Sequence, residues 1–241
     1  MTKIMTLRKI KKFAITTDWR RAFGGKSKGN KHLYRVVKIA KYLVKETDAD
    51  IFIVEAGALL HDIALPAGDD SDYLKNKQAA RKALARFQLN DSDIEAIAEC
   101  VATHEGTVRP KTPEAKIVHD ADVLEKSGIL GLIRHTWKMA NSGQIDPENI
   151  SRRDIGKIVH HIDWRKKQIQ TSAAKKLHRK IDMKLGVNKL NIITPQIAKL
   201  AKKAVITEDI AKIISKELTK DQRLKLARQL SLYYLKHKMS H

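Results

Sequence analysis

The sequence predicts an all-α protein, and three observations support that fold class. Apolar residues recur every three or four positions, as in Val36, Ala40 and Val44, which is the period of a helix with one buried face. No run of alternating apolar and polar residues indicates a strand, and capping residues precede several of the apolar runs. With 241 residues, 42% of them hydrophobic, the chain is long enough for one large domain or one domain with an appendage.

Three helices are expected in the first half of the chain. One begins at His32, after a glycine-rich loop. The next, over residues 52–63, is almost entirely apolar and should be a buried core helix. The third begins near Ser92 and ends at His104. Loops are predicted at residues 23–30, 65–72, 105–113 and 141–147.

Capping patterns predict where later helices begin. Thr112-Pro113-Glu114 places a capping hydroxyl, a proline and an acid at a helix start. Asp146-Pro147-Glu148 predicts a second start, and Thr219 to Gln222 fits a capping box.

A strongly basic helix is expected over residues 165–189, followed by three short helices over 193–204, 207–217 and 219–238. A boundary is expected near residue 188. The chain is therefore predicted to comprise a main domain, residues 1–188, and a basic C-terminal helical extension, residues 189–241.

Charge is distributed unevenly along the chain. The formal net charge is +21, and residues 141–241 contribute 23 Lys and Arg against 9 Asp and Glu. Such an excess favours phosphate-rich partners, including nucleotides and nucleic acids, although a basic solvated surface would look the same. A single cysteine excludes an intramolecular disulfide and a cysteine zinc cluster. No signal peptide and no run of 18 apolar residues is present, so a cytoplasmic location without a membrane span is expected.

Histidines and aspartates lie at the ends of the predicted helices or inside apolar ones. His61 and Asp62 occur in the buried helix, where polar groups must be paired or ligated because unpaired burial costs several kcal/mol. Imidazole and carboxylate ligands together suit Mn²⁺, Fe²⁺, Co²⁺, Ni²⁺ or Zn²⁺ better than Ca²⁺ or Mg²⁺, which prefer oxygen ligands alone. Each residue alone has a structural explanation, and only their joint context points to a site.

Four segments together resemble the HD-domain metal-dependent phosphohydrolases, in particular the small stand-alone branch of that family. They are KHLYRVVKIAKYL, IVEAGALLHDIA, IAECVATHEG and EAKIVHDADVLEKSGILGLIR, within a resemblance covering roughly residues 28–185. The resemblance implies an HD-domain helical bundle that binds a divalent ion, Mn, Fe, Co, Ni, Zn or Mg. Two departures concern the pocket: Glu125 stands where aspartate is common, and Ala64 where glycine often follows the motif.

Transferred residue by residue, the family's metal ligands fall on His32, His61, Asp62 and Asp122. Asp120 competes with Asp122 for the last position. Two residues apart on a helix, their carboxylates diverge by about 200°, so both should not reach one ion. His104 matches a further family histidine that lines the pocket and touches phosphate or a second metal.

The implied activity is hydrolysis of a phosphate ester or anhydride, of phosphatase or phosphodiesterase type, with a nucleotide or other phosphorylated small molecule as the expected substrate. A divalent ion would activate water, Asp62 would orient it, and a protonated His104 would contact phosphate. Arg35 and Lys126, each near one turn from a predicted ligand, would neutralise phosphate charge or be ordinary surface cations. The alternative is a nucleic-acid-binding or regulatory module with a non-catalytic HD core, suggested by the basic C-terminal part.

Overall fold

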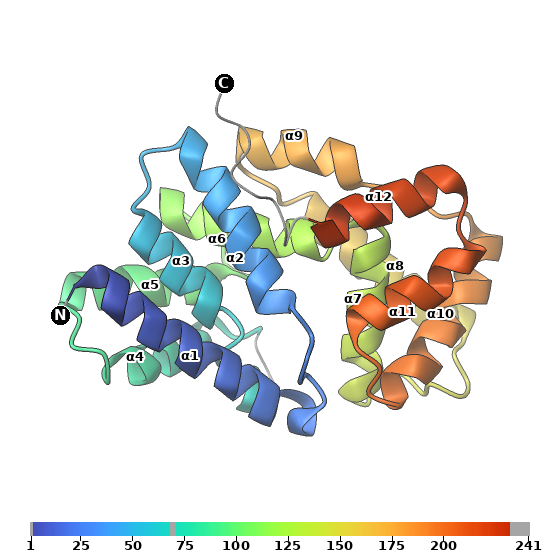
Figure 1. The fold of residues 1–241 in the computed structure, drawn as a ribbon, viewed down its shortest axis with the longest axis horizontal. Helices are drawn as coiled ribbons and strands as arrows, with labels where there is room; N and C mark the ends of the chain where they lie inside the picture. The colour runs from blue at the N-terminus through green and yellow to red at the C-terminus, as the bar shows by residue number, and fades with distance from the viewer. Residues whose placement is uncertain (1, 68–70, 232–241) are drawn as a thin grey trace.

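The computed structural model describes residues 2–67 and 71–231, and helices make up its regular structure throughout (Figure 1). The predicted all-α class is confirmed, since these residues contain no strand. The α-helices are α1 (Lys3–Arg21), α2 (His32–Leu43), α3 (Ile51–Leu60), α4 (Tyr73–Leu84), α5 (Asp91–Thr103), α6 (Pro113–Glu125), α7 (Gly128–Asn141), α8 (Arg152–Lys166), α9 (Ser172–Ile181), α10 (Val187–Lys202), α11 (Thr207–Ile214) and α12 (Lys220–Ser231). Short 3-10 turns lie at Ala22–Gly25, Val44–Glu46, Leu65–Ala67 and Ser215–Glu217.

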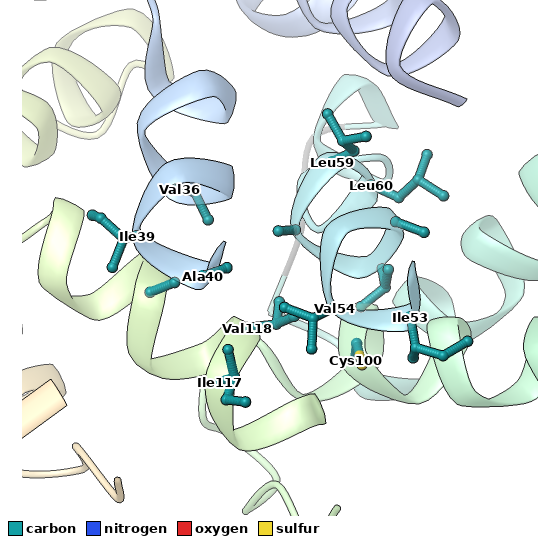
Figure 2. Close-up of a cluster of buried hydrophobic side chains, with 14 of the residues drawn as sticks. Val36, Ile39, Ala40, Ile53, Val54, Leu59, Leu60, Cys100, Ile117 and Val118 are labelled. Carbon is teal, nitrogen blue, oxygen red and sulfur yellow. The ribbon is translucent and has the colours of Figure 1, made fainter. Parts of the chain in front are cut away.

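The first hydrophobic core is built by α1 to α6, with α9 packed on its edge. Helix α3 lies at its centre, and eight of its ten residues are buried. Figure 2 shows side chains of α2, α3, α5 and α6 meeting in this core, with Cys100 of α5 beneath α3. The apolar run is therefore the buried core helix that the sequence predicts, but the helix ends at Leu60 instead of residue 63, so His61 and Asp62 lie in the turn that follows it.

Close packing of α3 against α5 depends on Gly57. A methyl group added there would lie 2.7 Å from Cβ of Cys100 and 3.3 Å from a methyl of Val118. Contacts under about 3 Å are repulsive and cannot be relieved by a side-chain rotation when one partner is a Cβ atom. The glycine thus allows the approach of two helices whose C-terminal ends carry His61 and His104.

The second core lies between α7, α8 and the three C-terminal helices α10 to α12, which Figure 1 shows together on the other side of the molecule. Trp137 of α7 is 1% exposed, and its indole N–H donates to the carbonyl of Val205 at 3.0 Å. Helix α12 reaches back to the start of α7, where Gln229 accepts from the N–H of Leu130 and donates to the carbonyl of Ser127. Residues on both sides of position 188 share this core, and the domain boundary there stays a prediction.

Several helix starts match the sequence patterns. Thr112 caps α6 by accepting from the N–H of Ala115, with Pro113 in the first turn. Thr219 and Gln222 exchange reciprocal hydrogen bonds at the start of α12, which is the predicted capping box.

The helix start predicted at Asp146-Pro147-Glu148 is wrong. Asp146 accepts from the N–H of Glu148 and from the amide of Asn149, which closes a turn instead. Helix α8 begins later, where Ser151 and Asp154 form a capping box.

The continuous basic helix predicted over residues 165–189 is also wrong. Helix α8 ends at Lys166, α9 runs only from Ser172 to Ile181, and α10 begins at Val187. The first interruption, between α8 and α9, has a tertiary cause, because the backbone N–H groups of Gln170 and Thr171 donate to the buried carboxylate of Asp120 instead of to helical carbonyls. The observed C-terminal helices otherwise resemble the expected ones, although residues 232–238 of the last prediction lie outside the described part of the chain.

No helix in the described part of the chain combines the length and the apolar character that crossing a membrane requires.

Candidate metal centre

Three helix ends bring four of the predicted residues to one point. His32 is the first residue of α2, His61 follows the last residue of α3, and Asp122 lies in the final turn of α6. Because α3 ends at Leu60 and gives way to a turn, His61 and its neighbour Asp62 no longer have to diverge as they would inside a helix. All four side chains are at least nine-tenths buried.

Candidate ligand atoms of His32, His61 and Asp122 lie close to one another, as they would around a single ion, and the carboxylate of Asp62 adjoins both histidines. Nε2 of His32 lies 3.0 Å from Nε2 of His61, 3.3 Å from Asp62 and 3.4 Å from Asp122. Nε2 of His61 lies 3.4 Å from Asp62 and 3.5 Å from Asp122. First-row ions bind such atoms at about 2.0–2.2 Å, so two ligands of one ion lie about 3.0 Å apart at 90° and about 3.4 Å apart at a tetrahedral angle.

Hydrogen bonding of the other ring nitrogens explains why this arrangement favours a cation. Nδ1 of His61 donates to the carbonyl of Ala58 at 2.8 Å, and Nδ1 of His32 lies 2.9 Å from a carboxylate oxygen of Glu125. With the proton on each Nδ1, both Nε2 atoms present lone pairs to each other and to two carboxylates. Such a set of acceptors repels itself unless a metal ion or a proton lies among them. The donor set therefore fits a divalent first-row ion.

The pKa shifts of His61, Asp62 and Asp122 also show that positive charge is favoured among these side chains. Burial opposes a charge on His61, but Asp62 and Asp122 outweigh it and raise its pKa to about 9. Burial would also raise the pKa of Asp122, yet Lys126, Arg165 and His61 hold it well below its usual range. The pKa of Asp62 is held low in the same way against burial, chiefly by His61 and Lys126. Both carboxylates are thus ionised at neutral pH and available as ligands.

His104 stands beside the four residues rather than among them. Its Nδ1 donates to the carbonyl of Val101, and its Nε2, which has no hydrogen-bond partner, lies 3.7 Å from Asp62 and 3.6 Å from Glu105. His104, Glu105 and Asp122 form a second grouping with candidate ligand atoms close together. Two cationic side chains already form ion pairs with the two carboxylates of that grouping.

Those two cations are Lys126 and Arg165. Nζ of Lys126 donates to Asp122 at 3.0 Å and lies 3.5 Å from Glu105, while Arg165 pairs with Asp122 at 2.6 Å and with Glu105. The predicted position of Lys126, one turn beyond Asp122, thus brings it to the carboxylate. Arg165 was missed, because 43 residues separate it from Asp122 and no local pattern links them.

Asp120 and Asp122 have separate environments. Asp122 faces the two histidines, whereas Asp120 accepts from the backbone N–H groups of Gln170 and Thr171 and from the hydroxyl of Thr171. This agrees with the opposite helix faces expected for residues two apart.

Arg35 lies behind the candidate ligands and not in a pocket. Its guanidinium is 1% exposed and pairs with Glu125 at 2.7 Å and with Glu208 at the start of α11. Two carboxylates already compensate its charge, so the predicted contact with a substrate phosphate lacks structural support. What its position does support is a chain of contacts from Glu208 through Arg35 and Glu125 to Nδ1 of His32.

A small pocket opens beside Asp62. Lys126, Arg134 and Lys138 line it with Phe23, Leu65 and His135. Arg134 is 9% exposed, its Nε lies 3.8 Å from a carboxylate oxygen of Glu125, and that Nε has no hydrogen-bond partner. Arg134 was not identified from the sequence, although it follows Lys126 by only eight residues. A tight turn, at which Gly131 packs against the carbonyl of Lys126, brings both side chains to this pocket. A pocket lined by one carboxylate and three cations suits a phosphate group bound near a metal ion.

Comparison with known families links this geometry to known proteins. Residues 30–127 match the model described as the HD domain, and this range includes the four candidate ligands. None of the curated proteins compared matches the chain.

Solved structures share the fold over most of the chain. YpgQ from Bacillus subtilis, solved in complex with ADP, superposes with a TM-score of 0.56 at 20% identity, covering 84% of this chain and 97% of that one. A protein from Lactobacillus plantarum gives 0.57 at 20% identity, covering 81% and 96%. A protein described as an HD-superfamily hydrolase, from Bacillus thuringiensis, gives 0.52 at 22% identity, covering 90% and 98%. At these identities the similarity shows a common fold.

Proposed function

We propose that this chain is a metal-dependent phosphohydrolase of the HD type, on the premise of the match between residues 30–127 and the HD domain model. Its reaction is the cleavage of a phosphate ester or anhydride, and its substrate class is nucleotides. The observation that carries the proposal is the convergence of His32, His61, Asp62 and Asp122 at spacings of 3.0 to 3.5 Å.

These four residues would hold the ion, and a bound divalent ion supplies an acidified water and polarises a phosphoryl oxygen. Asp62 is the ligand that also lines the pocket, so its carboxylate orients the attacking water toward phosphorus. Lys126, Arg134 and Lys138 bind the phosphate oxygens and offset the charge that develops on them. His104 stands next to Asp62, where it positions the carboxylate or contacts the phosphate.

Support for a nucleotide substrate comes from two directions. The pocket is rich in cations, which suits a phosphate group, and a protein of similar fold, YpgQ, was solved in complex with ADP.

Metal content and hydrolysis on a nucleotide panel test the proposal. Purified protein is expected to bind a divalent first-row ion and to hydrolyse at least one nucleotide. His61→Ala and Asp62→Asn should abolish both, while His160→Ala, which removes an exposed histidine of α8, should retain both. Protein that binds no ion, or that remains equally active in the His61→Ala variant, would refute the proposal.

A second candidate function rests on the basic exposed face of α9. The exposed residues there are Lys175, Lys176, Arg179 and Lys180, and Glu46 lies 3.9 Å from Lys176. This face would bind nucleic acid through phosphate contacts, with the HD core regulatory or non-catalytic. RNA binding should then weaken steeply with salt and weaken further when these four residues are changed to glutamine. Binding that is absent or insensitive to salt would exclude this function.

A further inference from the structure

A groove of about 540 Å³ continues outward from the pocket beside Asp62. The two spaces share Phe23, Leu65, His135 and Lys138 in their walls. Because they are continuous, a phosphate held at the ligand cluster would leave the rest of its molecule in the groove. A volume of this size lies in the range of pockets that bind small organic ligands, roughly 300–1,000 Å³.

Phe23 lies where the pocket meets the groove, in a backbone conformation that aromatic residues rarely adopt. Its φ of 51° and ψ of 37° fall in the left-handed region, where a bulky side chain is strained and persists only if its surroundings impose it. The ring packs edge-on against buried Trp137, with centroids 5.0 Å apart. Trp137 is in turn held by its hydrogen bond to Val205. The strained turn thus presents a half-buried aromatic ring to both spaces at a defined position.

His135 contributes a polar group to the lining of both spaces. Its side chain is 6% exposed, its ring lies 4.4 Å from that of His161, and its Nε2 has no hydrogen-bond partner. Burial, reinforced by His161 and nearby cations, holds its pKa well below the usual range. The ring is therefore neutral and can hydrogen-bond to a hydroxyl or an amide without adding charge.

The charge of the groove favours an anionic molecule. Arg21, Lys138 and Lys157 line it, and among the described residues Glu105 is the acidic member of the lining. Arg165 already pairs with Glu105. An aromatic ring, an unpaired neutral imidazole and an excess of cations match the base, the sugar and the phosphates of a nucleotide.

We propose that this groove is the nucleoside-binding subsite of the enzyme, with the base packed against Phe23 and a polar group of the nucleoside bonded to His135. The inference rests on the proposed function, since it assigns the groove to the remainder of the phosphate substrate. It names Phe23, rather than any candidate metal ligand, as the residue that selects nucleotides over small phosphate esters.

Equilibrium binding to metal-free protein tests the subsite without turnover. AMP and adenosine are titrated into the native protein, Phe23→Ala and Phe13→Ala. Phe13 is the matched control, because it is also half-buried and packs edge-on against one aromatic ring, Phe87, but lies outside the groove. Phe23→Ala should weaken binding of both ligands by about tenfold or more, as loss of base stacking typically does, and Phe13→Ala should leave binding within about twofold of native.

Two further variants keep the test decisive if Phe23→Ala folds poorly. Phe23→Gly accommodates the left-handed backbone and should lose nucleoside binding while remaining folded by circular dichroism. Phe23→Tyr keeps the ring and should restore binding. Native protein that hydrolyses phosphate esters but binds adenosine no better than Phe23→Gly does would overturn this inference and leave the proposed function standing. Protein that binds adenosine through Phe23 but hydrolyses nothing would support the subsite and refute the proposed function.

Discussion

The contact chain from Glu208 to His32 links the C-terminal helices to the candidate metal centre. Glu208, on α11, pairs with the buried guanidinium of Arg35, and Arg35 donates to Glu125 at 2.7 Å. Glu125 lies 2.9 Å from Nδ1 of His32 and so orients that ligand. Replacing Glu208 with glutamine removes one charge from the far end of this chain and leaves every candidate ligand in place.

The magnitude follows from burial. Arg35 is 1% exposed and would keep one of its two carboxylate partners, so Glu125 alone would have to offset its charge. Glu125 then polarises His32 less, and changes in such outer contacts typically lower metal affinity by 10- to 100-fold, or about 1.4 to 2.7 kcal/mol. Glu208 is 18% exposed in its side chain, so water screens part of the loss and the lower end of this range is expected.

Isothermal titration with Mn²⁺ measures the affinity, and thermal unfolding with and without Mn²⁺ measures the same energy through linkage. Glu217→Gln is the matched control, because Glu217 is exposed in the same C-terminal segment. A Glu208→Gln variant that folds normally and binds Mn²⁺ as tightly as Glu217→Gln would refute the link between this extension and the metal centre.

Three other predictions concern titration, ligand choice and packing. The pKa of His61 is raised from 6.5 to about 9, so its charge stabilises the metal-free fold fully below about pH 6.5, and this contribution is lost as pH rises through 9. Metal-free protein should therefore melt at lower temperature as pH rises over that window while its affinity for Mn²⁺ increases; a flat profile in both would contradict this. Asp122→Asn should abolish metal binding. Asp120→Asn should keep the metal but lower the free energy of unfolding by about 1–3 kcal/mol, because Asp120 accepts three hydrogen bonds from Gln170 and Thr171. Metal analysis and urea unfolding distinguish the two variants, and loss of metal in Asp120→Asn would reverse the assignment. Gly57→Ala should destabilise the protein by about 1–3 kcal/mol through overpacking against Cys100. Gly156→Ala, in open space on α8, should leave stability unchanged or raise it by up to about 1 kcal/mol. Equal effects at the two glycines would show that packing is not the cause.

Local sequence patterns predicted the helices best where the helix start satisfies its own backbone. Thr112, Thr219 and Gln222 lie within three residues of the groups they cap, so their role is visible in the sequence. Prediction failed where a distant group competes for the backbone. Nothing near residue 170 shows that the carboxylate of Asp120, fifty residues earlier, will interrupt a helix there.

The residues of the candidate site also divide into those identifiable from a local segment and those that only long-range contacts bring to the site. His32, His61, Asp62 and Asp122 could be named because they fall within segments that resemble the HD family, and in the structure the two histidines lie close to both carboxylates. Arg165 and Arg134 could not be named, because ion pairing depends on distance in space and any surface arginine has the same sequence signature. Arg35 shows the converse, since its sequence position suggested a phosphate contact and the fold placed two carboxylates around it.

The sequence by itself determined the all-α class and the apolar core helix that spans Ile51–Leu60, because helical period is a property of short segments, and its resemblance to the HD family named the candidate ligands. Only the tertiary structure decided which helix ends meet, which carboxylate of the Asp120–Asp122 pair faces the histidines, and that Glu208 pairs with Arg35 while Phe23 lines the groove. The physical reason is that these contacts join residues far apart in the chain, and long-range packing, not local propensity, sets the distances between them.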